Sequence, residues 1–202
     1  MFFNGDFKQL GQCDVSALKS QIDNFDESLW DEDKTRQNTY SVHKKTQTIN
    51  LIFDEDLRHE NPTALPIYHQ LEEYLIPIES LIKAYYARSL KLKRLASRYE
   101  YPYFIRAILV RLAPNSSISK HQDHGESLSR CHRIHIPLQT TEQVLFSVGK
   151  TTINIKEGEI WEINNRNIHS VLNQSEHYRI HLIVDYVIPG EKVFDLQNVL
   201  IA

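Results

Sequence analysis

The sequence predicts a mostly β fold of the α+β type: a barrel-like jelly roll with helices packed outside it. Beyond Tyr101, short runs of alternating apolar and polar residues recur with turn residues between them. No long helical pattern separates these runs, which argues against parallel crossovers. The chain of 202 residues, 41% hydrophobic and 24% charged, contains no linker rich in glycine, proline or serine. We therefore expect one domain over residues 1–202.

The first half of the chain, residues 1–100, predicts a helix-rich flanking layer. A helix is indicated near residues 14–22, and the acidic stretch DESLWDEDK that follows predicts a solvated loop. Alternating apolar residues between about 40 and 53 predict a strand with one buried face. Apolar residues at helical spacing from 67 to 86, interrupted by Pro77, predict either one kinked helix or two short ones.

Residues 101–190 predict the jelly-roll core. Turn signals such as PNSS, KEGE and NNRN separate its strand candidates. These candidates are YFIRAILVRLA, RCHRIHIPLQ, VLFSV, TTINI, IWEI, HSVLN and YRIHLIVDYV.

Histidines concentrate in this core, since seven of the ten lie between His121 and His181. His121 and Asp123 stand two positions apart at the end of a predicted strand, so both side chains are expected on one side. His169 begins a later strand. Two imidazoles and one carboxylate on one face of a metal are the ligand set of non-haem Fe(II) oxygenases. A His-x-Asp tripeptide alone is unspecific, so the prediction depends on its surroundings.

The strand YRIHLIVDYV predicts a cationic barrel interior. If Ile180 and its alternate neighbours pack outward, Arg179 and His181 face inward. A buried guanidinium needs an anion and matches a carboxylate in a bidentate way. Arg133 and His135 share a face of another strand by the same argument. The pocket would therefore be electropositive and suited to a dicarboxylate co-substrate.

Several of these residues have a second interpretation. Arg179 could pair with a surface glutamate, and His135 and His181 could be structural imidazoles. Arg111 is a candidate substrate residue if it faces inward, whereas Arg106 on the same run is expected to face solvent. Trp161 is either a core residue or a residue lining the site.

The segments HQDHGESLSRCHRIHIPL, GEIWEINNRNIHSVLN and YRIHLIVD resemble the aspartyl/asparaginyl β-hydroxylase family, which includes bacterial free-proline hydroxylases of similar core sequence. The likeness covers about residues 104–185, with a weaker echo in RQNTYSVHKKTQTINL. It implies a double-stranded β-helix, cupin-like in form, that binds Fe(II) and 2-oxoglutarate and hydroxylates an amino-acid side chain.

Residue roles follow from the resemblance. His121, Asp123 and His169 would hold iron, and Arg179 would pair with the distal carboxylate of 2-oxoglutarate. Arg133 and His135 would serve the other end of this co-substrate or the substrate. A serine that helps to hold the distal carboxylate in animal members is replaced by Val110.

We therefore expect an Fe(II)- and 2-oxoglutarate-dependent dioxygenase that hydroxylates a free amino acid or a peptidyl Asp, Asn or Pro residue. The alternatives are a non-redox cupin and a catalytically silent module that binds metal and ligand. A formal charge of -3 argues against a nucleic-acid partner. The absence of a signal sequence and of a long apolar segment predicts a cytoplasmic protein without integral membrane association. The oligomeric state is not predicted.

Overall fold

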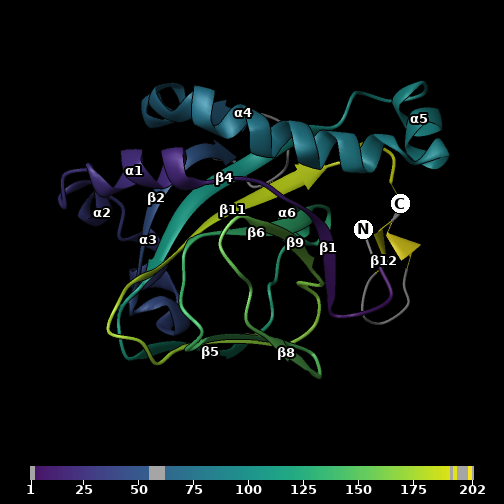
Figure 1. Cartoon of the computed structure of the whole chain (residues 1–202). Coiled ribbons are helices and arrows are strands. Elements are labelled where there is room, and N and C mark those ends of the chain that lie inside the picture. The colour runs from purple at the N-terminus through teal and green to yellow at the C-terminus, as the bar shows by residue number, and fades with distance from the viewer. Residues whose placement is uncertain (1–2, 55–61, 192, 195–199, 202) are drawn as a thin grey trace.

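Two antiparallel sheets form the body of the molecule (Figure 1). The structure, a computed structural model, describes residues 3–54, 62–191, 193–194 and 200–201. The larger sheet, here the major sheet, has the strand order β1-β9-β6-β11-β4-β2-β3, and the minor sheet has the order β5-β10-β7-β8.

The major sheet consists of β1 (Phe7–Gln12), β2 (Thr46–Asp54), β3 (Pro62–Ala64), β4 (Tyr103–Leu112), β6 (His132–Gln139), β9 (Glu159–Ile163) and β11 (Arg179–Val187). The minor sheet consists of β5 (Ser116–His121), β7 (Val144–Val148), β8 (Thr151–Ile153) and β10 (His169–Asn173). A separate pair contains β12 (Val193–Phe194) and β13 (Leu200–Ile201). This architecture confirms the predicted mostly β, double-stranded β-helix fold.

The described helices are α1 (Ser16–Asp23), α2 (Leu29–Glu32), α3 (Thr35–Thr39), η1 (Ser41–His43), α4 (Pro66–Ala87), α5 (Leu90–Ala96) and α6 (Glu126–Ser129). Helices α1, α4 and α5 lie on the outer side of the major sheet, whereas α3, η1 and α6 lie beside the barrel. Figure 1 shows α4 lying along the outer face of this sheet. Leu71, Leu75 and Ile78 lie on one side of α4 at helical spacing and share a hydrophobic core with Leu182 of β11.

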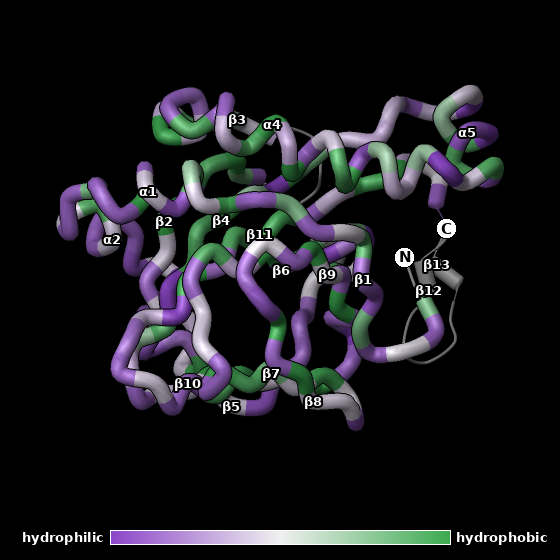
Figure 2. The backbone as a smooth tube through the Cα atoms, viewed as in Figure 1, coloured by the Kyte–Doolittle hydropathy of each residue, from purple (hydrophilic) through white to green (hydrophobic). Residues whose placement is uncertain are grey.

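Alternation along the central strands separates this helix-covered face from the barrel interior. On β11, Ile180, Leu182 and Val184 belong to the core beneath the helices, while Ile183 packs on the opposite face. Both faces are buried, because all nine residues of β11 are inaccessible. Figure 2 shows the resulting mixture of hydrophobic and hydrophilic residues along the strands and along α4. The barrel interior therefore receives the polar residues of an otherwise apolar strand.

A second hydrophobic cluster joins the two sheets inside the barrel. It contains Leu112 of β4 and Ile163 of β9 from the major sheet, with Phe146 of β7 and Val171 of β10 from the minor sheet. This cluster fills part of the interior and holds the sheets together.

Some predicted elements differ in the structure. The stretch around Trp30 forms α2 rather than a solvated loop, because the indole is 2% exposed and needs burial. The predicted strand at residues 40–53 begins at Thr46, after η1. Of the two alternatives predicted at Pro77, one helix or two, the structure has one helix.

The proposed division at residue 100 does not follow the sheet. Three strands from the first hundred residues, β1, β2 and β3, belong to the major sheet. Among the described residues, no helix combines the length and the apolar composition that a membrane crossing requires.

Candidate metal centre

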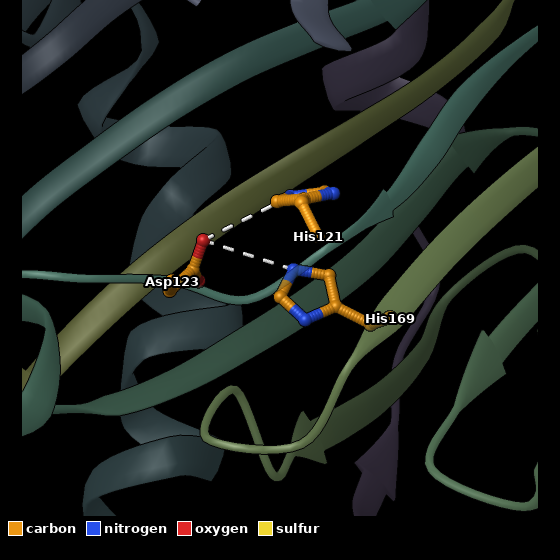
Figure 3. A group of neighbouring side chains, drawn as sticks. All are labelled: His121, Asp123 and His169. Carbon is orange, nitrogen blue, oxygen red and sulfur yellow. Dashed lines mark ion pairs between the residues drawn. The ribbon is translucent and has the colours of Figure 1, made fainter.

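The three predicted ligands meet at one end of the minor sheet. His121 is the last residue of β5 and His169 the first of β10, and the two are paired across these strands. Asp123 follows β5 by two residues. Its Oδ1 lies 3.9 Å from His121 Nε2 and 3.7 Å from His169 Nε2. One ligand atom from each residue lies within 4.8 Å of the others (Figure 3).

Backbone carbonyl groups orient both imidazoles. His121 Nδ1 lies 2.8 Å from the Ser119 carbonyl oxygen, and His169 Nδ1 lies 3.0 Å from the Asn167 carbonyl oxygen. A carbonyl oxygen only accepts, so in each ring Nδ1 donates its hydrogen. In the neutral form of each ring Nε2 then carries the lone pair, and this nitrogen faces the carboxylate of Asp123. This arrangement of the second ring nitrogen is typical of metal-binding histidines.

Arg133 holds the carboxylate of Asp123 in place. Its Nη1 donates to Asp123 Oδ2 over 2.7 Å, which leaves Oδ1 directed at the two imidazoles. Burial raises the pKa of Asp123, but the charge of Arg133, joined by those of His169 and His121 whenever these rings are protonated, outweighs it and holds the pKa below its ordinary value. Asp123 is therefore ionised and ready to bind a cation.

A buried ionic network supports Arg133 from behind. Its Nε and Nη2 donate to the two carboxylate oxygens of Asp185 over 2.9 and 2.8 Å. Arg106 Nη1 donates to the same carboxylate over 2.6 Å, and Arg106 Nη2 donates to Ser127 over 2.7 Å. Asp54 lies 3.6 Å from Arg106. The network therefore links β2, β4, β6 and β11 to the carboxylate of Asp123.

The placement of Arg133 bears on its predicted role. Three of its N–H groups bind the carboxylates of Asp123 and Asp185. Its direct contact is thus with a candidate metal ligand, and service to the co-substrate stays a prediction. Asp185 and Arg106 were not among the predicted site residues.

Arg179 lies inside the barrel and is 1% exposed. Its Nη2 lies 2.7 Å from His181 Nδ1, and its guanidinium stands 5.7 Å from the centre of the Phe146 ring. Among the described residues, its Nε has no hydrogen-bond partner. Burial, together with the charge of Arg36, lowers the pKa of Arg179 to about 9, so it stays protonated at neutral pH. This is a buried cation bonded to a neutral ring.

Two further imidazoles line the interior beside Arg179. The His135 and His181 rings lie 5.8 Å apart, and burial with the charge of Arg179 holds the pKa of each well below its ordinary value. In the described part of the chain, His181 Nε2 and both ring nitrogens of His135 have no hydrogen-bond partner. Neutral imidazoles of this kind can donate to a polar ligand. The expectation that these residues face the interior agrees with the geometry.

The predicted orientations of the Arg111 and Arg106 side chains are wrong. Arg111 lies on the helix-covered face, where it forms a bidentate pair with Glu27 at 3.0 and 2.6 Å. Its guanidinium stacks between Trp30 and Tyr178 at 4.6 and 4.5 Å. Arg106, expected in solvent, is 7% exposed inside the barrel. Residues five apart on a strand occupy opposite faces, and the assignment of the two faces was reversed.

Trp161 lies opposite His135 in the register of β9 and β6. Its indole packs edge-to-face on Phe7 at 6.2 Å, and its Nε1 donates to Glu159 over 3.1 Å. These are core-type contacts, and its role toward substrate stays a prediction. Val110 packs with Ile108 and Ile183 on the interior face of the major sheet.

Two residues near the triad were not predicted as site residues. Arg36 of α3 lies with its Nη2 3.2 Å from His43 Nε2, and the His43 ring stands edge-to-face on the His121 ring at 5.5 Å. Burial, with the charge of Arg133, lowers the pKa of Arg36 to about 10. The only sequence signal was the weak family likeness of RQNTYSVHKKTQTINL, which contains both residues.

The donor set fits a divalent ion of the iron class. Two neutral imidazole nitrogens and one carboxylate oxygen suit Fe(II), and the second hydrogen bond of each ligand is satisfied. A family model described as aspartyl/asparaginyl beta-hydroxylase matches residues 89–189, half of the chain. The chain belongs to the aspartyl/asparaginyl β-hydroxylase family. It is an Fe(II)- and 2-oxoglutarate-dependent dioxygenase of the hydroxylase type.

Solved structures share the fold of this β-hydroxylase family member at low sequence identity. A prolyl-4-hydroxylase from Pseudomonas putida has a TM-score of 0.55 at 12% identity, with 93% of this chain and 95% of that chain covered. The viral collagen prolyl hydroxylase of Paramecium Bursaria Chlorella virus-1 has a TM-score of 0.55 at 11% identity, covering 91% and 96%. A 2OG-Fe(II) oxygenase family oxidoreductase from Burkholderia pseudomallei has a TM-score of 0.50 at 13% identity; the match spans 70% of this chain and 66% of that one.

Proposed function

We propose that this dioxygenase binds Fe(II) through His121, Asp123 and His169, binds 2-oxoglutarate through Arg179, and hydroxylates an amino-acid side chain. The substrate would be a free amino acid or a peptidyl Asp, Asn or Pro residue. The observation that carries the proposal is the buried guanidinium of Arg179, which has no carboxylate among its described hydrogen-bond partners. A dicarboxylate co-substrate supplies the missing anion.

Each group has a defined task in this proposal. Iron with 2-oxoglutarate and dioxygen supplies the oxidation when bound. Arg133 fixes the orientation of Asp123, and the two backbone carbonyl groups fix the ring orientation of His121 and His169. Arg179 receives the distal carboxylate, and His181 holds one guanidinium nitrogen in position. The strands provide the stiffness that such placement needs.

The proposal also gives His135 a task. Its ring nitrogens are buried in the barrel and have no partner among the described residues. The nitrogen that carries the hydrogen would donate to the oxo-acid end of 2-oxoglutarate or to the substrate. The neutral state of the ring favours this role, because a ring without charge can bind beside Arg179 without strong repulsion.

A screen of free amino acids and peptides with Fe(II), ascorbate and 2-oxoglutarate in air tests the proposal. We expect succinate to form and one substrate to gain the mass of one oxygen atom. Asp123→Ala should abolish both products, whereas Asp23→Ala, at an exposed position on α1, should keep them. A protein that never consumes 2-oxoglutarate, or an Asp123→Ala variant with full activity, would contradict the proposal.

A further inference from the structure

A second cationic group lies beside the triad, on a part of the chain far from it in sequence. Arg36 Nη2 lies 3.2 Å from His43 Nε2, and the His43 ring contacts the His121 ring at 5.5 Å between centres. Asp33, three residues before Arg36, is bridged to Thr48 of β2. The helix α3 and η1 therefore place Arg36 and His43 against the barrel at the level of the candidate metal ligands.

Several buried polar atoms of this group are unpaired. Within the described residues, Arg36 Nη1, Gln37 Oε1, His43 Nδ1 and Thr48 Oγ1 have no hydrogen-bond partner and no access to solvent. His43 is 8% and Thr48 1% exposed. An unpaired buried polar group is unfavourable, because it has lost water without gaining a partner. Four of them on neighbouring elements indicate that this group lacks a polar partner.

The chemistry of these atoms selects an anion. A guanidinium only donates, so the contact with Arg36 makes His43 Nε2 an acceptor and leaves the hydrogen on Nδ1. Arg36 Nη1 and His43 Nδ1 are therefore both donors. The carboxylates of Asp123 and Asp185 bind Arg133, and that of Asp33 accepts from Thr35 and Asn50. Among the described residues, no hydrogen bond or ion pair joins any of the three to Arg36. His43 therefore holds one nitrogen of the guanidinium and leaves Arg36 Nη1 as the free donor, and a carboxylate is the anion that a guanidinium binds best.

We infer that Arg36, held in position by His43, binds a carboxylate of the substrate, so that the substrate is an amino acid or residue recognised through its carboxylate. This inference rests on the proposed function, because 2-oxoglutarate must occupy Arg179. The two residues differ in their place in the fold: Arg179 stands on the central strand β11 and is 1% exposed, whereas Arg36 stands on the short helix α3, outside both sheets, and the residue as a whole is partly exposed. A co-substrate that stays through the reaction suits Arg179, and a substrate that enters afterwards suits Arg36.

The carboxylate can come from two sources. It is either the α-carboxylate of a free amino acid or the side-chain carboxylate of an acidic residue in a peptide. Gln37 Oε1, next to Arg36 in the chain, is an unpaired acceptor among the described residues. It would accept from the ammonium group of a free amino acid or from an amide N–H of a peptide.

Binding to the full-length protein with Mn(II) and 2-oxoglutarate tests the inference without turnover. The probes are the common free L-amino acids, the carboxamide of each one that binds, and a capped peptide with Asp beside the same peptide with Asn. Thermal shift finds the binders and calorimetry gives their Kd. If the substrate is a free amino acid, we expect the acid to bind and its carboxamide not to bind. If the substrate is a peptide, we expect the peptide with Asp to bind more tightly than the peptide with Asn.

Variants then assign the contact. Arg36→Gln should raise the Kd of the carboxylate probe about tenfold to a hundredfold and leave the Kd of 2-oxoglutarate unchanged. Arg36→Lys, which keeps the charge, should recover part of the affinity. Lys45→Gln, at an exposed position two residues after His43, should bind like the wild type. Unchanged binding of 2-oxoglutarate also shows that Arg36→Gln is folded.

The outcomes separate this inference from the proposed function. The inference is overturned if the carboxamide binds as well as the acid, if no carboxylate probe binds, or if Arg36→Gln weakens 2-oxoglutarate as much as the probe. In each of these cases 2-oxoglutarate still binds the wild type and the proposed function stands. If 2-oxoglutarate fails to bind the wild type and no succinate forms in the activity screen, the proposed function itself fails.

Discussion

Arg133 contacts the candidate metal ligand Asp123 and the buried Asp185 at the same time. It leaves one oxygen of Asp123 directed at the two imidazoles, so one residue sets both the charge and the orientation of this ligand. Three fixed hydrogen bonds from a rigid planar group give better placement than a flexible ammonium would. The affinity for metal should therefore depend on a residue that does not itself bind the ion.

Replacing Arg133 tests this dependence. In Arg133→Gln the carboxylate of Asp123 loses its fixed donor, so we expect the Kd for Mn(II) or Fe(II) to rise about 10- to 100-fold. Arg106 still neutralises Asp185, which should preserve folding. Competition with a metal-binding dye measures the Kd, and Arg88→Gln at an exposed position is the control. An unchanged Kd would show that the contact does not position Asp123.

Arg179 and Arg111 form a matched pair for the co-substrate. Loss of a charged hydrogen-bond partner costs about 2 to 3 kcal/mol, so Arg179→Gln should raise the Kd of 2-oxoglutarate about 30- to 150-fold. The affinity for metal alone should not change. Arg111→Gln should leave 2-oxoglutarate binding unaltered, because Arg111 pairs with Glu27 on the other face of the sheet. Calorimetry measures the Kd of 2-oxoglutarate for both variants. An equal rise in this Kd for Arg111→Gln and Arg179→Gln would contradict the assignment of Arg179 to the distal carboxylate.

At the scale of elements, His132 joins β6 to its surroundings. Its Nδ1 contacts Glu162 of β9, and its Nε2 lies 2.9 Å from Glu191 beyond β11. Tyr86 of α4 donates to the same Glu162 over 2.9 Å. Burial lowers the pKa of His132, but the two carboxylates outweigh it and raise the pKa above its ordinary value. The pKa values of Glu162 and Glu191 are held below theirs.

The stability from this cluster should depend on pH in a defined direction. Because the pKa of His132 is raised on folding, its contribution to the free energy of unfolding is fully present below the unfolded pKa of about 6.5. That contribution is lost as the pH rises through the pKa of the folded state. The carboxylates, whose pKa values are lowered on folding, contribute stability above about pH 4.3, and this contribution is lost at lower pH. His132→Gln should therefore lower the free energy of unfolding by about 2 kcal/mol between pH 4.5 and 6.5, and by less above that window.

Urea unfolding at a series of pH values measures the difference. His177→Gln, at an exposed position, should unfold like the wild type throughout. A difference between wild type and His132→Gln that grows as the pH rises above 7 would show that the sign is wrong.

The elements that the sequence predicts well are those with a repeated local pattern. The alternation in YRIHLIVDYV placed Arg179 and His181 on one face correctly, because the strand keeps one register with β4 from Arg179 to Asp185. The orientation of Asp123 had a different cause from the one predicted, since it lies beyond β5 and is held by Arg133. The faces of Arg106 and Arg111 were reversed, because alternation separates two faces without saying which one is inside.

Other features depend on contacts that no local pattern encodes. Trp30 is buried in an acidic stretch whose composition indicates solvent. Arg36 and His43 reach the triad from about eighty residues away, through the pairing of β2 with β4. Only the assembled sheet brings these residues together, so charge and periodicity within their own segment could not identify them.

Across the whole molecule, the barrel interior holds more cations than carboxylates to pair with them. Arg106 and Arg133 share Asp185, whereas the described partners of Arg36 and Arg179 are imidazoles. Buried charges without counter-ions destabilise a fold. A ligand that brings carboxylates into the barrel should therefore stabilise the whole domain and not only its own site.

Thermal unfolding with matched ligands tests this coupling. With Mn(II) present, 2-oxoglutarate at one hundred times its Kd should add about 2.7 kcal/mol, which raises Tm by about 5 to 10 °C for a chain of this size. 2-Oxobutyrate keeps the oxo-acid end but lacks the distal carboxylate, so at the same concentration it should give a much smaller rise. The difference between the two ligands should disappear in Arg179→Gln. If 2-oxobutyrate stabilises the wild type as much as 2-oxoglutarate does, the distal carboxylate does not relieve the buried charge of Arg179.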